Sequence, residues 1–167
     1  MKCNFKAWLL SIATILSVAT GIHAQKRDEI KPPPATATLA ESQKWFVDSF
    51  VKYASYKTRV TAVTISNPKF DACTFSFTQV RKFSSTSIAT MGATRTTNTV
   101  KEDLSFDLSR IPADGVNVID HIYPEVQALE LKFADDPRIV EIVVKSEASE
   151  AFKSTLIQIR RLCASKG

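Results

Sequence analysis

The sequence predicts an α+β domain in which an antiparallel, strongly bent sheet or roll lies between an N-terminal helix and a C-terminal amphipathic helix. Three observations support this class. Apolar residues recur at helical spacing near both ends of the domain, the segments between them alternate apolar and polar residues, and the links between those segments have hairpin length. Short links imply antiparallel pairing, and we expect about six or seven strands.

The first helix is predicted from Thr38 to about Tyr56. Thr38 and Glu41 fit a capping box, in which each side chain accepts a hydrogen bond from the other residue's backbone N–H. The apolar face that follows consists of Leu39, Phe46, Val47, Phe50, Val51 and Ala54.

The next segments are predicted as the first strands. Residues 59–66 are rich in β-branched side chains, and 67–69 (Asn-Pro-Lys) are typical of a turn. A second strand begins at Cys73 and alternates apolar and polar side chains. Its parity changes at Val80, which indicates a bulge near Gln79.

Residues 84–94 are rich in Ser and Thr and are predicted as a loop with at most one short edge strand. Residues 96–108 alternate again. Glu102 is the one polar side chain at an inward position of this strand.

Three further strands are expected after a turn at 111–115, in which Pro, Asp and Gly favour chain reversal. The first strand covers 116–120. Residues 127–133 and 138–145 alternate on either side of an Asp-Asp-Pro turn at 135–137, and they predict a hairpin.

The last element is predicted as a helix capped by Ser146. Glu147 and Glu150 stand in its first turn and Arg160 and Arg161 near its end, which suits the helix dipole at both termini. The apolar stripe consists of Ala148, Phe152, Thr155, Leu156, Ile159, Leu162 and Cys163.

Four segments resemble a group of uncharacterised exported bacterial domains. These domains have an early helix with a Trp, a strand that begins with Cys and continues with alternating aromatics, and a last helix that ends in Leu-Cys. The corresponding segments are Trp45, 73–77, 104–108 and 152–163. The resemblance implies a pleckstrin-homology-like roll of strands followed by a helix, and no activity. A cystatin-like or NTF2-like curved sheet around the first helix is the alternative.

Residues 1–24 have the pattern of a secretory signal peptide. Lys2 and Lys6 precede the apolar run 8–18, and Ala24 offers a small residue for cleavage. We therefore expect export to the periplasm, the cell envelope or the medium. The alternative is that this segment is retained as an anchor.

The remaining chain divides into a Pro-rich flexible leader, 25–37, and a single domain, 38–167. Loss of residues 1–24 removes two lysines and no acid, so the net charge falls from +5 to +3. This balance is too mild to predict nucleic-acid binding. After the signal segment, no stretch is apolar enough to predict a transmembrane span.

Cys73 and Cys163 are the two cysteines that remain in the exported chain. An oxidising compartment makes this pair a disulfide candidate, and two buried free thiols are the alternative.

Arg81, Lys82 and Arg95 flank the Ser/Thr-rich segment. If the strands on either side pair, these cations gather beside hydroxyl groups at one end of a hairpin. The sequence therefore predicts a ligand-binding site for an anion such as a phosphate or a sulfated sugar. A solvated hairpin end is the alternative.

No pattern predicts a catalytic residue, a metal site or a cofactor. His121 stands next to Asp120, with Tyr123 and Glu125 nearby, but adjacent residues on a strand point apart and a polar loop is the better interpretation. There is no nucleophile elbow and no Gly-rich phosphate loop.

We expect a non-enzymatic exported module that presents loops or an edge strand to a protein, glycan or envelope partner. The alternative is a small ligand carrier or hydrolase with a pocket in a curved sheet. A polar pocket with His121 and an acid on its wall would favour the alternative. Exposed apolar loop tips or an unprotected strand edge would favour the interaction module.

Overall fold

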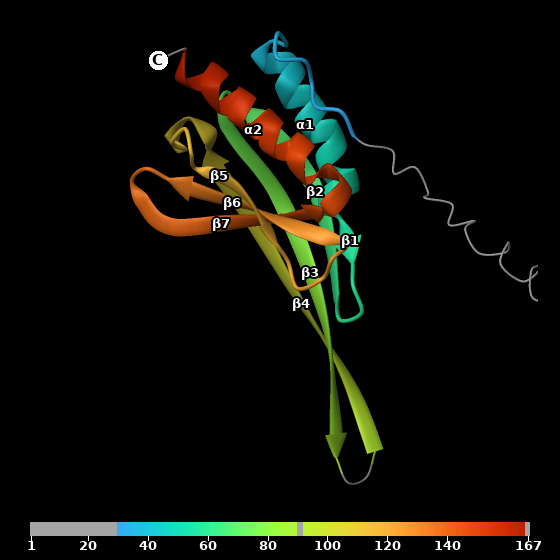
Figure 1. Ribbon diagram of the computed structural model, residues 1–167. Coiled ribbons are helices and arrows are strands. Elements are labelled where there is room, and N and C mark those ends of the chain that lie inside the picture. The colour runs from blue at the N-terminus through green and yellow to red at the C-terminus, as the bar shows by residue number, and fades with distance from the viewer. Residues whose placement is uncertain (1–29, 90–91, 166–167) are drawn as a thin grey trace, which may run out of the picture.

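The described chain folds into two antiparallel sheets and two helices (Figure 1). The computed structural model describes residues 30–89 and 92–165, without the side chains of 86–89, 92–95 and 138. The elements in chain order are α1 (Leu39–Ala54), β1 (Tyr56–Lys57), β2 (Thr61–Asp71), β3 (Thr74–Ala89), β4 (Gly92–Asp107), the 3₁₀ turn η1 (Leu108–Arg110), β5 (Val116–Asp120), β6 (Val126–Phe133), β7 (Asp136–Lys145), the 3₁₀ turn η2 (Ser146–Ala148) and α2 (Ser149–Ala164).

The strand orders are β1-β2-β3-β4 in one sheet and β5-β6-β7 in the other, and every described pairing is antiparallel. The α+β class, the helix at each end of the domain and the antiparallel pairing are therefore confirmed. The strands do not form a single closed sheet.

Helix α1 begins where its capping box predicts. The backbone N–H of Thr38 donates to Glu41 Oε2 at 2.7 Å, and the N–H of Glu41 donates to Thr38 Oγ1 at 3.3 Å. The Thr38 N–H, and after it the Thr38 hydroxyl, hold the pKa of the Glu41 carboxyl below its ordinary value. The helix ends at Ala54, earlier than predicted, because Ser55 is extended and its hydroxyl accepts a hydrogen bond from the Ile65 N–H at 3.0 Å.

The bulge of the first sheet lies in β2. The register of the β2–β3 pair shifts between Ser66 and Lys69, and Asn67 adopts a φ of 54°, a left-handed conformation that Asn tolerates. The turn predicted here is therefore wrong, because β2 continues through it. The bulge predicted near Gln79 is also wrong, since β3 pairs with β4 without interruption.

The Ser/Thr-rich segment 84–94, predicted as a loop, forms the far end of the β3–β4 hairpin. The described ladder ends at Ala89↔Gly92, whereas β2 pairs with β3 only as far as Phe83. Beyond that point the sheet has two strands, and the ribbon extends away from the rest of the fold (Figure 1). Thr favours extended backbone because it is β-branched. We call this ribbon, residues 84–89 and 92–97, the hairpin arm.

The hydrophobic core lies where the two helices meet the two sheets. Helix α1 packs on β2 and α2, and α2 packs on η1, β5 and β6. Phe46 of α1 has its ring centroid 5.0 Å from Phe75 of β3 and 5.0 Å from Phe152 of α2. Phe106 and Phe133, with ring centroids 6.2 Å apart, join the two sheets.

Two boundaries near the C-terminus differ from prediction. Strand β7 begins at Asp136, so the turn of the β6–β7 hairpin lies before the Asp-Pro pair. Ser146 does not cap α2. It begins η2 and donates its hydroxyl to the carbonyl of Pro124 at 2.8 Å, and α2 starts at Ser149. The predicted stripe of α2 is buried, including Phe152, Leu156 and Ile159, except that Leu162 is half-buried.

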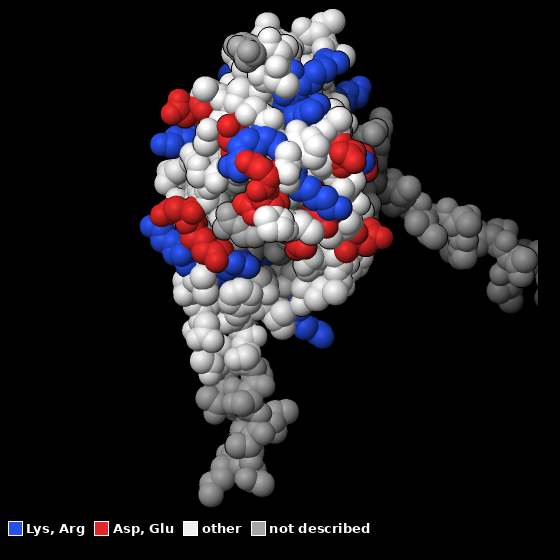
Figure 2. Space-filling model, turned by 90° about the vertical axis from the view of Figure 1, so that its left-hand side faces the viewer, with Lys and Arg blue, Asp and Glu red and all other residues white. Residues whose placement is uncertain are grey.

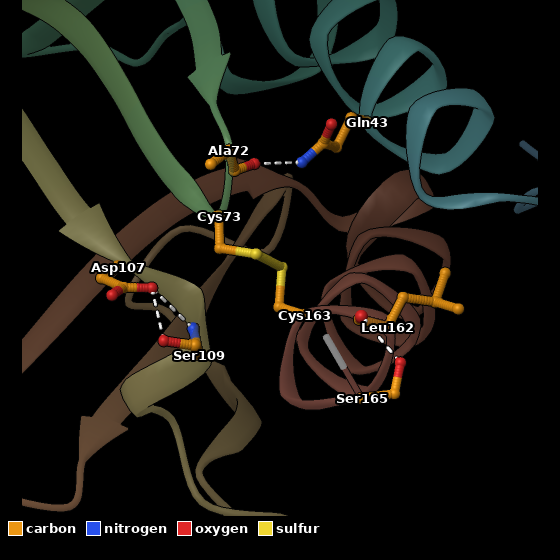
Figure 3. The surroundings of a disulfide bond; sticks show 8 residues. All are labelled: Gln43, Ala72, Cys73, Asp107, Ser109, Leu162, Cys163 and Ser165. Carbon is orange, nitrogen blue, oxygen red and sulfur yellow. Dashed lines mark hydrogen bonds between the residues drawn. A yellow bond between two sulfur atoms is a disulfide. The ribbon is translucent and has the colours of Figure 1, made fainter. Parts of the chain in front are cut away.

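Cys73 and Cys163 form the disulfide that the sequence left as a candidate (Figure 3). Their Cα atoms are 5.9 Å apart, within the range that a disulfide requires. Next to the bond, Gln43 Nε2 of α1 donates to the carbonyl of Ala72 at 2.6 Å. Both helices are therefore fastened to the start of β3.

The part of the predicted leader from Ile30 onward lies against the domain. Gln158 Nε2 of α2 donates to the carbonyls of Pro34 at 2.9 Å and Ala37 at 3.3 Å. Ala37 is buried, and Ile30 packs against the core. Residues 1–29, which contain the predicted signal segment, lie outside the described residues.

Candidate functional site: the hairpin arm and the cleft at its base

The hairpin arm has open strand edges. Strand β4 is the outer strand of its sheet, and β3 loses its second neighbouring strand after Phe83. The last backbone hydrogen bond described on that side runs from the Ser84 N–H to the Val60 carbonyl at 2.8 Å. Unpaired backbone groups of this kind are a template for another strand.

The arm also lacks the charges that usually protect an edge strand. Arg95 is the only charged residue in the sequence of the arm. Figure 2 shows acidic and basic side chains distributed over the body of the protein, whereas the described part of the arm is uncharged in this view. Lys101 and Asp103 are exposed on β4, but they stand at the base of the arm.

Apolar side chains are exposed around the same base. Ile122, in the connection between β5 and β6, is 84% exposed, and Phe83 of β3 is 38% exposed. Val60 in the β1–β2 turn and Val100 on β4 are also exposed. The structure thus combines a strand edge with exposed apolar residues at one end of the molecule.

A cleft of about 330 Å³ opens between the two sheets beside these residues. Strands β1, β2 and β3 form one wall, and the β5–β6 connection and β7 form the other. Its lining includes Tyr56, Gln79, Arg81, Phe83, His121, Tyr123 and Glu141.

Arg81 lines the cleft from β3. Its Nη2 pairs with Glu102 Oε2 at 2.5 Å, which explains the one polar residue at an inward position of β4. The Arg81 guanidinium lies 5.9 Å from the centre of the Phe83 ring. Its Nε is buried and has no hydrogen-bond partner among the described residues.

Tyr56 and His121 supply hydrogen-bonding groups to the cleft. Burial is the main influence on the pKa of the Tyr56 hydroxyl and raises it. The charge of Arg81 lowers this pKa and Tyr123 raises it, and the net shift is upward, so the hydroxyl keeps its proton at neutral pH. His121 stacks on Tyr123 with ring centroids 5.5 Å apart, and its Nδ1 accepts a hydrogen bond from the Tyr123 N–H at 3.3 Å. That bond assigns the proton of a neutral imidazole to Nε2, which is then a donor.

The polar residues around His121 do not form a metal site in the described structure. Asp120 accepts a hydrogen bond from Gln127 Nε2 at 3.0 Å, and Glu125 is exposed. The part of the chain that the structure describes contains no group of three or more His, Cys, Asp or Glu residues able to hold a metal ion.

The predicted anion-binding residues occupy separate positions. Arg81 lines the cleft, and Lys82 is exposed on the opposite face of the sheet because consecutive strand residues alternate. The backbone of Arg95 pairs with that of Thr86 in the arm, and its side chain lies outside the described structure.

Several residues of the cleft escaped sequence analysis. Gln79 and Phe83 share the inward parity of Phe75 and Phe77, and this parity continues once the bulge is placed in β2 rather than β3. That alternation of inward and outward side chains was the sequence signal that could have identified Gln79 and Phe83 as inward-facing residues. No local pattern indicates Glu141, because it reaches the cleft from the second sheet.

Fold and site together define an α+β domain with a projecting hairpin arm and a polar cleft at its base. Comparisons with models of protein families, with curated proteins and with solved structures found no match. Within the described residues, neither helix has the length and apolar character needed to cross a membrane.

Proposed function

We propose that the protein is an exported, non-enzymatic binding module whose hairpin arm accepts an extended segment of a partner protein as an added strand. The observation that most directly supports this function is the open strand edge of the arm. Beyond Phe83 the ladder has six pairs, from Ser84↔Thr97 to Ala89↔Gly92, and no third strand among the described residues joins it. An isolated two-stranded hairpin is marginally stable in water, and an added strand satisfies its unpaired backbone groups.

Exposed apolar side chains supply anchors next to this edge. In strand addition, main-chain hydrogen bonds provide affinity and contacts with alternate side chains provide specificity. Each Å² of apolar surface that the partner covers contributes about 25 cal/mol. The expected partner segment is weakly charged, is rich in β-branched residues and places an apolar side chain against Phe83 or Ile122, both of which are exposed.

Export belongs to the same proposal. It is supported by the signal-like pattern of residues 1–24 and by the disulfide, since such bonds persist in oxidising compartments. The pleckstrin-homology-like arrangement is also proposed. Antiparallel strands that precede a last amphipathic helix support it, whereas α1 and the division into two sheets are additions to such a roll.

The cleft favours a second candidate function, that of a small-ligand carrier. It has a volume of about 330 Å³ and carries His121 and Glu141 on its wall. The hydroxyl groups of its described lining belong to Tyr56, Thr61 and Tyr123, and no Ser or Cys lines it. This set supports binding rather than hydrolysis, because a nucleophile paired with His121 is missing among the described lining residues.

A shortened arm tests the leading function. Replacing residues 86–95 with Asn-Gly joins the ladder partners Ser85 and Thr96 through a tight hairpin turn. The Ser85↔Thr96 pair lies four pairs from Ala89↔Gly92, so the last pair of the shortened ladder has the same side-chain orientation as the last pair described in the full chain. The full chain and this variant are used as baits in native envelope and secreted fractions.

The full chain should retain a partner that the shortened variant retains at least tenfold less, and Lys82→Ala should behave as the full chain. Partner binding should also slow hydrogen exchange in the arm. Equal retention by the shortened variant, or protection confined to the helices, would place the binding site elsewhere.

A further inference from the structure

The cleft presents aromatic faces that the core does not use. Phe75 and Phe77 of β3 are buried, but Phe83 on the same face is 38% exposed because β3 leaves the body there. Tyr123 borders the cleft from the opposite wall and is stacked against His121. Two rings, one on β3 and one in the β5–β6 connection, therefore offer apolar surface to a ligand between them.

Flat hydrogen-bonding groups stand beside these rings. Gln79 and Glu141 line the cleft with an amide and a carboxylate, and Arg81 adds a guanidinium that Glu102 holds at 2.5 Å. The unpartnered Nε of Arg81 shows that Glu102 does not satisfy all the donors of this side chain. Donors and acceptors are both present, so the cleft suits a ligand that carries both.

The balance of charge selects the class of ligand. The described lining residues include one guanidinium, that of Arg81, and one carboxylate, that of Glu141, so the lining has a charge of each sign. A phosphate or sulfate would meet this carboxylate. A cationic ligand would meet the guanidinium, and a wholly apolar ligand would bury polar groups without partners.

We propose that the cleft binds a neutral saccharide, whose apolar ring face packs on Phe83 or Tyr123 while its hydroxyl groups bond Arg81, Gln79 and Glu141. This assignment rests on the ligand-carrier candidate proposed above and names its ligand class. It does not require strand addition by the arm, although both proposals use the exposed ring of Phe83.

The test uses defined probes. Maltohexaose and chitohexaose are titrated into the full chain, with inorganic phosphate and heparin in parallel, and backbone amide shifts are recorded by NMR. At least one neutral oligosaccharide should bind saturably, with affinity unchanged between low and high salt. Its shifts should be confined to residues 79–83, 121–123 and 141.

Matched variants locate the site. At least one of Phe83→Ala and Tyr123→Ala should weaken saccharide binding at least tenfold, whereas Lys82→Ala, on the opposite face of β3, should leave it unchanged. Glu141→Gln keeps a planar hydrogen-bonding group at an exposed position and should weaken binding only a few-fold while the fold is retained. The shortened arm should bind saccharide as the full chain does.

Three results would overturn the assignment. They are binding of heparin or phosphate alone with strong salt dependence, saccharide binding that survives both aromatic variants, and absence of saturable binding to either neutral oligosaccharide. A neutral apolar dye, Nile red, distinguishes failure of the saccharide assignment from failure of the carrier function itself. Dye binding at the same residues without saccharide binding would leave a carrier of another ligand class, and binding of neither would remove the carrier function as well.

Discussion

The two ends of the β3–β4 hairpin share one ladder but have different surroundings. At one end, Cys73 is bonded to Cys163 of α2, and its carbonyl accepts a hydrogen bond from the Leu108 N–H at 3.0 Å. At the other end, the same strands continue past Phe83 without a third strand in the described structure. Stability is therefore concentrated at the disulfide end, and backbone groups available to a partner are concentrated in the arm.

Truncation of the aromatic core should produce the largest effect. Phe152 is fully buried, with its ring centroid 5.0 Å from Phe46 and 5.5 Å from Trp45. Removal of a buried Phe side chain costs about 3–5 kcal/mol, a large share of a domain's stability. Phe152→Ala should lower the urea midpoint steeply or prevent folding, and exposed Ser154→Ala should change the free energy of unfolding by less than about 0.5 kcal/mol. Equal, small shifts would show that α2 is peripheral.

Loss of the disulfide should have the next largest effect. The bonded cysteines are 90 residues apart in sequence, and chain entropy sets an upper limit of about 4–5 kcal/mol for a loop of this size. The double variant Cys73→Ala, Cys163→Ala should lose about 2–4 kcal/mol of unfolding free energy. Hydrogen exchange should show the last turn of α2 opening first. An unchanged urea midpoint would mean that packing alone holds α2 in place.

The capping box should contribute a smaller, pH-dependent term. The folded state holds the pKa of Glu41 below its ordinary value of 4.5, so its contribution is complete above that pH and is lost as the pH falls through the lower pKa of the folded state. Glu41→Gln retains an acceptor but does not titrate. The difference in unfolding free energy between the two proteins should shrink as the pH falls below 4.5. A difference that stays constant in acid would mean that the carboxylate adds nothing beyond its hydrogen bond.

The arm should contribute least to stability. Replacing residues 86–95 with Asn-Gly removes four ladder pairs, from Thr86↔Arg95 to Ala89↔Gly92, that have no third strand. We expect the free energy of unfolding to change by less than about 1 kcal/mol, because such a hairpin is marginally stable alone. Thermal and urea unfolding measure this change. A loss as large as that of the disulfide variant would show that the arm supports the body and would remove the contrast between the two ends.

Sequence analysis succeeded where near neighbours decide the structure. The capping box needs only Thr38 and Glu41, and the stripe of α2 follows from helical periodicity. The disulfide became a candidate because the expected exported chain keeps two cysteines and would meet an oxidising compartment. The hairpin arm was missed because Ser and Thr also bond locally to the backbone and are common in loops, so their strand state depends on pairing across the hairpin.

The sequence by itself determined the α+β class, the antiparallel pairing, most of the buried face of each helix and the two cysteines that were candidates for a disulfide. It placed Val51 on the apolar face of α1 wrongly, because that side chain is 42% exposed. Only the tertiary structure decided that the strands divide into two sheets, that β2 carries the bulge and that Tyr56, Arg81 and Tyr123 line one cleft. The physical reason is that periodicity specifies which residues share a face of one element. The neighbour of that face is set by long-range packing, which here brings the second sheet and its β5–β6 connection against the base of the arm.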